Sequence, residues 1–311
     1  MKQVEWVGQD GKLERLMRSV QAGRIVHALL FSGPRGTGKR TAAKWFARAM
    51  FCQGEPKPCG VCPACKRFDA GAHPDVRFVR PEKNVIKVDA IRELIDYLSM
   101  RPYEGGMHVV VIEQAERMNP SAQNALLKTL ENPSGDAMLM LVSDAPGSLL
   151  STIVSRCQTV RFSPLSVEDC AGVLQSRGME RQRACQLAGI AQGAVGRALE
   201  LDGDESFMDL RERTIRSLET LNGDATVARA ASLISEGKGS ERTILEIMEL
   251  WARDLMAVQN GAAPFEQMDA ERLRRSRLNG KKLLQAVMEA GQKLSANVSW
   301  INVLESMYFE L

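Results

Sequence analysis

Residues 27–41 read HALLFSGPRGTGKRT, and this stretch decides the fold. A short apolar run leads into Gly33, Gly36 and Gly38, which are followed by Lys39 and a segment with helical periodicity. Glycines between a strand and a helix let several backbone N–H groups face one point, where the helix N-terminus and the ammonium add positive charge. The stretch therefore predicts a phosphate-binding loop between a buried strand and a helix.

The loop departs from the pattern G-x-x-x-x-G-K-[ST] at its last position, where a hydroxyl should bind Mg²⁺. Arg40 stands there, and Thr41 lies about 100° further round the helix. Lys39 and the glycines favour some affinity for phosphate, whereas the missing hydroxyl argues against Mg²⁺-dependent binding. Whether the loop binds ATP or ADP stays open, and a glycine-rich turn without a ligand is the simpler alternative.

A second departure follows the apolar run at residues 107–112. Glu113 and Gln114 stand where hydrolysing nucleotide enzymes carry Asp-Glu, whose second carboxylate activates water. Gln114 cannot accept a proton from water. Together with Arg40, this predicts a chain that does not hydrolyse ATP by itself.

Strand and helix signals alternate up to about residue 163, and the apolar runs are those of buried parallel strands. We therefore expect an α/β domain with a doubly wound parallel sheet over residues 1–163. After Pro164 the strand signals stop, and long amphipathic segments follow. The sequence predicts a small helical domain at 164–204 and a larger helical domain at 205–311.

Four of the seven cysteines lie close together, at Cys52, Cys59, Cys62 and Cys65. The pattern C-x6-C-x2-C-x2-C can close a tetrahedron of thiolates around Zn²⁺, and a closed four-ligand site is structural, not catalytic. An iron–sulfur cluster and unliganded thiols are the alternatives. The zinc module is thus expected as an insertion at about residues 52–65.

Composition limits the function further. The net charge of +3, with 25% charged residues, allows only a local and modest contact with nucleic acid. No apolar run reaches the roughly 18 residues that a membrane span needs, and no signal peptide is apparent. We expect a cytoplasmic protein without a membrane partner.

At the level of family, the chain resembles the delta-prime subunits of the bacterial DNA polymerase III clamp loader, which are AAA+ proteins. The likeness rests on residues 27–39, the cysteine module and three further stretches, HPDVRFVRPEKNVIKVDAIREL (73–94), NPSAQNALLKTLENP (119–133) and TIVSRCQTVRFSPL (152–165). The resemblance implies an AAA+ P-loop domain, a helical lid at 164–204 and a helical collar that assembles subunits at 205–311. Its zinc module is shorter, since the family commonly has eight residues between the first two cysteines.

The resemblance also implies roles for residues and partners. Arg156 matches the Ser-Arg-Cys motif, whose arginine acts in trans as an arginine finger at a neighbour's ATP site. The implied partners are the gamma/tau and delta subunits in a hetero-oligomeric ring, the sliding clamp, and primer-template DNA through the complex. The family's lid motif usually places an Arg near Gly196.

The main hypothesis is a non-hydrolysing, stator-type subunit that completes a neighbour's ATP site during clamp loading. Two alternatives remain, an active gamma/tau-type ATPase motor and a zinc-dependent nucleic-acid-binding protein with a vestigial P-loop. Arg40 and Gln114 oppose the first, and the scarcity of basic residues near the cysteines opposes the second.

Overall fold

In the part of the chain that the structure describes, five parallel strands form a sheet. They are β1 (Ala28–Ser32), β2 (Val76–Val79), β3 (His108–Ile112), β4 (Ala137–Ser143) and β5 (Gln158–Arg161), in the spatial order β2-β3-β4-β1-β5. The computed structural model describes residues 11–21, 26–104, 106–132, 136–221, 227–234, 239–264, 269–296 and 298–311. The predicted parallel α/β fold is confirmed.

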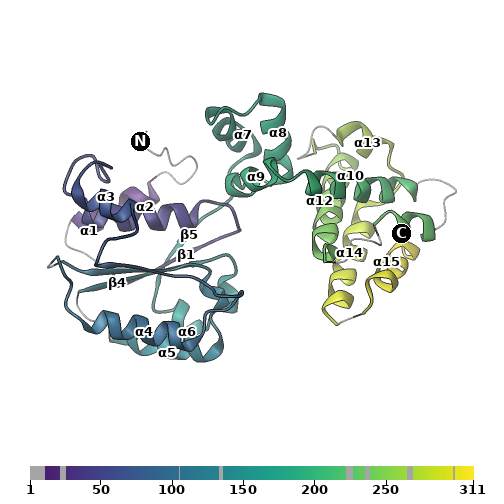
Figure 1. The fold of residues 1–311 in the computed structure, drawn as a ribbon. Coiled ribbons are helices and arrows are strands. Elements are labelled where there is room, and N and C mark those ends of the chain that lie inside the picture. The colour runs from purple at the N-terminus through teal and green to yellow at the C-terminus, as the bar shows by residue number, and fades with distance from the viewer. Residues whose placement is uncertain are drawn as a thin grey trace. The chain divides into compact units, whose positions relative to one another are not determined.

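Helices cover both faces of this sheet (Figure 1). One layer contains α1 (Lys12–Gln21) and α2 (Lys39–Phe51), and the other contains α4 (Val88–Ser99), α5 (Pro120–Glu131) and α6 (Ser151–Val154). All residues of β1, β3 and β4 are buried, whereas the edge strands β2 and β5 are partly exposed. Burial on both faces is the physical reason why the central strands have continuous apolar sequences.

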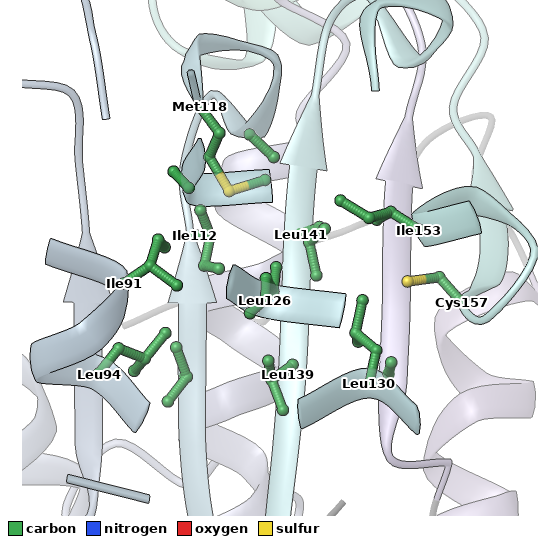
Figure 2. Packing of buried hydrophobic residues seen from close by; sticks show 14 of the residues in the cluster. Ile91, Leu94, Ile112, Met118, Leu126, Leu130, Leu139, Leu141, Ile153 and Cys157 are labelled. Atoms are coloured by element: carbon green, nitrogen blue, oxygen red, sulfur yellow. The ribbon is translucent and has the colours of Figure 1, made fainter. Parts of the chain in front are cut away.

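Successive residues of β1 belong to different cores, because side chains alternate across a strand. Leu30 packs with Leu126 and Leu139 on the side of α4 and α5, as Figure 2 shows for the latter two. Leu29 and Phe31 pack on the other side, against the layer of α2. Each fully buried side chain of this size contributes about 1.5–3 kcal/mol relative to an exposed one.

The chain divides into two compact units, and each is described by itself. The first comprises Met1–Leu165 with Ala194–Gly196, and the second comprises Ser166–Gly193 with Arg197–Leu311. The first ten residues of the predicted α/β domain lie outside the described residues. The division of the later residues into a lid at 164–204 and a collar at 205–311 stays a prediction.

The described residues of the second unit form helices and the loops that connect them. Its helices are α7 (Val167–Ser176), α8 (Arg181–Ile190), α9 (Val195–Asp202, which begins in the first unit), α10 (Glu205–Thr220), α11 (Val227–Ser232), α12 (Glu241–Gln259), α13 (Ala270–Arg275), α14 (Gly280–Ser295) and α15 (Trp300–Phe309). Helices α12 and α14 pack closely, with Leu255 and Leu283 fully buried. None of the helices described is long and apolar enough to cross a membrane.

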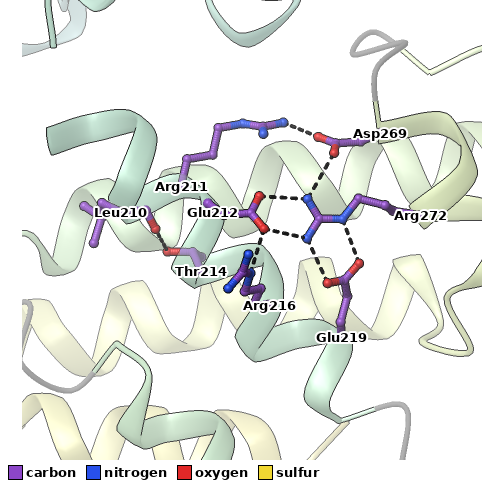
Figure 3. A network of polar contacts seen from close by, with 8 residues as sticks. All are labelled: Leu210, Arg211, Glu212, Thr214, Arg216, Glu219, Asp269 and Arg272. Carbon is purple, nitrogen blue, oxygen red and sulfur yellow. Dashed lines mark hydrogen bonds and ion pairs between the residues drawn. The ribbon is translucent and has the colours of Figure 1, made fainter. Parts of the chain in front are cut away.

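A polar clasp joins α13 to α10 (Figure 3). The Arg272 guanidinium bonds Glu219 through Nε (2.7 Å) and Nη2 (2.8 Å), and it bonds Glu212 through Nη1 (2.9 Å). Asp269 forms ion pairs with both Arg272 and Arg211. A planar guanidinium suits such paired contacts, so the clasp fixes the position of the short helix α13.

Two glycines of α14 provide a matched test of the α12–α14 packing. A Cβ at Gly280 would lie 2.8 Å from the backbone nitrogen of Met256 and 3.0 Å from the carbonyl oxygen of Ala252, whereas a Cβ at Gly291 meets nothing within 4 Å. We expect Gly280→Ala to destabilise the protein by about 1–3 kcal/mol and Gly291→Ala to stabilise it by up to about 1 kcal/mol. Thermal melting followed by circular dichroism should move in opposite directions for the two variants, and equal shifts would contradict this packing.

Candidate functional site

The glycine-rich loop connects β1 to α2. Gly33, Gly36 and Gly38 all have positive φ, at 149°, 79° and 87°. A Cβ at Gly33 would lie 2.0 Å from the carbonyl oxygen of Phe162, so only glycine fits where the chain leaves β1. The structure thus brings Gly33, Gly36, Gly38 and Lys39 together in one loop at the start of α2.

The Lys39 ammonium is already bound by the protein itself. Its Nζ donates to the carbonyl oxygen of Pro34 at 2.6 Å and lies 2.7 Å from Asp144 Oδ1. The Thr37 hydroxyl is a third, longer contact at 3.4 Å, and the lysine is only 3% exposed. An ammonium has three donors, so these contacts occupy all of them.

Arg40 occupies the position of the missing hydroxyl and forms an ion pair with Glu113. Its Nε lies 2.7 Å from Glu113 Oε2, and Glu113 is buried. Arg80 Nε is 3.2 Å from the same oxygen, and Lys44 Nζ is 3.7 Å from Oε1. The carboxylate that would help to bind Mg²⁺ is therefore neutralised by side chains of the chain itself.

The site also changes the pKa of Lys44, one of the cations near Glu113. Burial, together with the charge of Arg40, holds the pKa of Lys44 below its ordinary value, although Glu113 opposes the shift. Gln114, next along the chain, is exposed and has a positive φ of 52°. The end of β3 thus presents one buried carboxylate surrounded by cations, and an amide instead of a second acid.

Gly196 packs directly on the loop within the first unit. Its N–H donates to the carbonyl oxygen of Gly36 at 2.8 Å, and a Cβ at Gly196 would lie 3.0 Å from the same oxygen. An arginine at this position would not fit without moving the loop. Arg197 instead pairs with Glu246 at 2.7 Å.

The sequence identified the loop but missed some of its partners. Asp144 follows β4 directly, while Arg80 follows β2. The carboxyl ends of parallel strands meet at one edge of a sheet, so residues just after neighbouring strands converge. The position of Asp144 after an apolar strand was the available signal, and only the strand order shows that β4 lies beside β1.

The four predicted cysteines form one cluster. The Sγ atoms of Cys52, Cys59, Cys62 and Cys65 all lie within 4.8 Å of one another. A tetrahedral Zn²⁺ with bonds of about 2.3 Å holds its sulfurs about 3.8 Å apart, so this cluster could hold such a metal ion.

Backbone N–H groups point at these sulfurs. Cys59 N lies 3.1 Å from Cys52 Sγ, and Cys62 N lies 3.4 Å from Cys59 Sγ. Hydrogen bonds from the backbone of Gln53 and Cys65 lower the pKa of Cys62 to about 6. The thiolate is the form that binds metal, so these hydrogen bonds favour Cys62 as a ligand, whereas burial raises the pKa of Cys65 to about 12.

The cysteine module is fastened to α2 through α3 (Pro63–Asp69), a helix that the sequence analysis did not identify. Cys62 caps α3 by accepting a hydrogen bond from Cys65 N, and Arg48 of α2 pairs with Asp69 at 2.6 Å. Phe68 packs edge-on against Phe78 of β2. The module therefore belongs to the packed α/β unit.

Arg156 lies in the turn between α6 and β5. Its Nη1 donates to the carbonyl oxygen of Thr152 at 3.0 Å, and its Nη2 bonds Glu131 Oε1 at 2.7 Å. The side chain is 35% exposed. In this chain the guanidinium is held against the end of α5, and a neighbour could reach it only if it exchanges the Glu131 contact.

The residues beside Arg156 anchor this turn. Cys157 is buried in the core shown in Figure 2, and burial raises the pKa of its thiol to about 11. The Ser155 hydroxyl donates to the carbonyl oxygen of Thr152 at 3.2 Å. The burial of Cys157 and the hydrogen bond of Ser155 therefore hold the turn in place.

Comparison with known proteins gives the family. A family model described as DNA polymerase III, delta subunit, matches residues 8–166. DNA polymerase III subunit delta' of Bacillus subtilis is 31% identical over 318 residues, covering 97% of this chain and 96% of that protein. The chain belongs to the delta' family of DNA polymerase III subunits. A delta' member from Escherichia coli is 36% identical over 207 residues, which cover 65% of this chain and 61% of that protein.

Other similarities extend beyond the delta' family. DNA polymerase III subunit tau of Escherichia coli is 30% identical over 295 residues, covering 86% of this chain and 46% of that protein. The crystal structure of a DNA polymerase III gamma subunit-related protein from Thermotoga maritima has a TM-score of 0.46 and 17% identity, and the match covers 96% of this chain and 99% of that one.

The cysteine cluster of this delta' family chain yields a direct test. We expect purified protein to contain one Zn²⁺ per chain, and Cys62→Ser to lose the metal and melt at a lower temperature, because a closed thiolate site stabilises the fold that forms it. Cys185→Ser is the matched control, since Cys185 is exposed and lies outside the cluster. Elemental analysis that finds iron, or no metal in fresh wild-type protein, would rule out a zinc site.

Proposed function

We propose that this chain is a non-hydrolysing subunit of the DNA polymerase III clamp-loader complex. It would occupy a place in a ring with gamma/tau and delta subunits and support the ATP-driven loading of the sliding clamp on primed DNA. The observation that carries this proposal is the ion pair between Arg40 and Glu113, in a chain that belongs to the delta' family.

The ion pair between Arg40 and Glu113 opposes the binding of Mg²⁺. In working P-loop enzymes a hydroxyl of the loop and an acid after a neighbouring strand help to hold the ion. Here a guanidinium lies 2.7 Å from that acid, so a divalent ion would have to displace a bound cation and then face its repulsion. Gln114 also offers no carboxylate to activate water. The two substitutions act on different steps, metal binding and proton transfer, and both oppose turnover.

The alternative is a gamma/tau-type ATPase motor, which the 30% identity to a tau subunit over most of this chain favours. Steady-state hydrolysis of Mg²⁺-ATP by the isolated chain separates the two functions. We expect no turnover above a protein-free blank. Turnover at about 1 s⁻¹ or faster, within the range of ordinary enzymes, would establish a motor instead.

A nucleotide titration tests the role of Arg40 directly. We expect a fluorescent ATP analogue to bind the wild-type chain weakly and equally with and without Mg²⁺, because Arg40 already neutralises Glu113. Arg40→Thr removes the cation nearest to Glu113 and restores the loop hydroxyl, so Mg²⁺ should then tighten binding. If Mg²⁺ tightens binding of the ATP analogue to the wild type as much as to the variant, then Arg40 does not take the place of Mg²⁺ beside Glu113.

We propose further that Arg156 acts as an arginine finger at the ATP site of a neighbouring subunit. Its support is chemical: a guanidinium offers a rigid fork of N–H donors, which fits the charge spread over a γ-phosphate in the transition state. The side chain is partly exposed and needs only to exchange the Glu131 and Thr152 contacts. A γ-phosphate carries more negative charge than the Glu131 carboxylate, so it can compete with Glu131 for the Arg156 guanidinium.

Variants of the reconstituted complex distinguish the roles of the loop and the finger. Arginine fingers supplied in trans contribute about 10³- to 10⁵-fold in rate, so we expect Arg156→Ala to abolish turnover at one site of the ring and to impair clamp loading. Arg156→Lys should retain only part of the wild-type turnover and clamp loading. The control is the pair Lys39→Met with Asp144→Asn, which removes both charges of an ion pair whose lysine is buried and should leave turnover nearly unchanged.

The assembled complex must be confirmed by size-exclusion chromatography before the rates are compared. If the loop variant abolishes turnover while Arg156→Ala has no effect, the chain works as a motor and the present proposal is wrong.

A further inference from the structure

A second surface of this protein carries charge that the ATP-site role does not use. Residues 271–282 read ERLRRSRLNGKK, with six Lys or Arg and one Glu, a net charge of +5. The whole chain carries +3, so the remaining residues together carry 3 − 5 = −2. The segment is therefore far more basic than the chain as a whole.

The segment is a fixed corner of the second unit. Its apolar members Leu273 and Leu278 are buried, and Gly280 packs against α12. The Gln259 side chain, at the end of α12, donates to the carbonyl oxygen of Leu278 (2.7 Å) and accepts from Gly280 N (3.1 Å). The clasp of Arg272 in Figure 3 fixes the α13 side of the same corner.

Between these anchors the cations face solvent. We name this surface the basic corner; its exposed cations are Arg274, Arg275, Arg277, Lys281 and Lys282. Within the segment the one acid is Glu271, which lies 3.4 Å from Arg275 with both side chains about four-fifths exposed, so that pair is weak. No Asp or Glu occurs from residue 272 to 288 or from 255 to 264, the end of α12.

We propose that the basic corner binds the phosphate backbone of duplex DNA without reading its bases. The acidic neighbours Glu212, Glu219 and Asp269 are paired with Arg272 and Arg211. The exposed cations of the corner therefore attract a polyanion, and binding gains free energy from the release of the polyanion's counterions. The segment contains no aromatic residue, so it offers no platform for stacking single-stranded bases. Clustered charge without such a platform suits phosphate contacts that position a duplex.

The basic corner lies wholly in the second unit. It would therefore bind DNA in the same way if the first unit hydrolysed ATP.

The test uses the full chain and a fluorescein-labelled duplex of mixed sequence, followed by fluorescence anisotropy across a series of salt concentrations. The test variant changes Arg274, Arg275, Lys281 and Lys282 to Gln, and leaves the clasp residue Arg272 in place. The matched control changes Lys87, Arg101, Arg177 and Arg181 to Gln; these four are exposed, and the change in net charge is the same. Melting temperatures confirm that both variants are folded.

We expect the wild type and the control to bind with a Kd that rises steeply with salt. The test variant should bind roughly tenfold or more weakly at low salt, and the slope of log K against log salt should shrink by about 3 to 4, since each phosphate contact contributes about 0.9. Equal losses in the control and test variants would show a nonspecific effect of net charge and overturn the assignment. So would absence of binding by the wild type, or tighter binding of poly-glutamate than of duplex at equal charge.

Discussion

The structure depends on the burial of β1 on both faces, because that strand fixes the edge at which the charged groups meet. β1 lies between β4 and β5 and contributes Leu30 to one core and Leu29 and Phe31 to the other. Its end, and the ends of β3 and β4, therefore lie side by side. Gly33 must pass so close to the carbonyl oxygen of Phe162 that no other residue fits there.

At this edge the protein satisfies its own charges. Lys39 pairs with Asp144 and with a carbonyl oxygen, and Arg40 pairs with Glu113, so both of these cations already have partners within the protein. Isolated buried charges are costly, whereas paired and hydrogen-bonded ones are tolerated. A loop of this kind keeps the shape of a phosphate-binding loop while it has lost the free charge that such a loop offers. This pairing supports the proposed function of a subunit that does not itself hydrolyse ATP.

The second unit uses ion pairs in another way. Arg272 is surrounded by Glu212, Glu219 and Asp269, and it fixes a short helix whose other basic residues face solvent. A helix of six residues has little stability of its own, so such tertiary contacts determine its position. The clasp and the buried leucines thereby hold several like charges close together despite their repulsion.

The sequence by itself determined the α/β class, the glycine-rich loop, the cysteine cluster and the family, because these depend on local periodicity and on spacing within short stretches. Residues 107–112 and 137–142 read as buried strands because both of their faces are covered. Only the tertiary structure decided that Asp144 pairs with Lys39, that Arg80 pairs with Glu113 and that Glu131 pairs with Arg156. These pairs join segments distant in sequence, and which strand ends converge depends on the order of strands in the sheet, which no local pattern encodes.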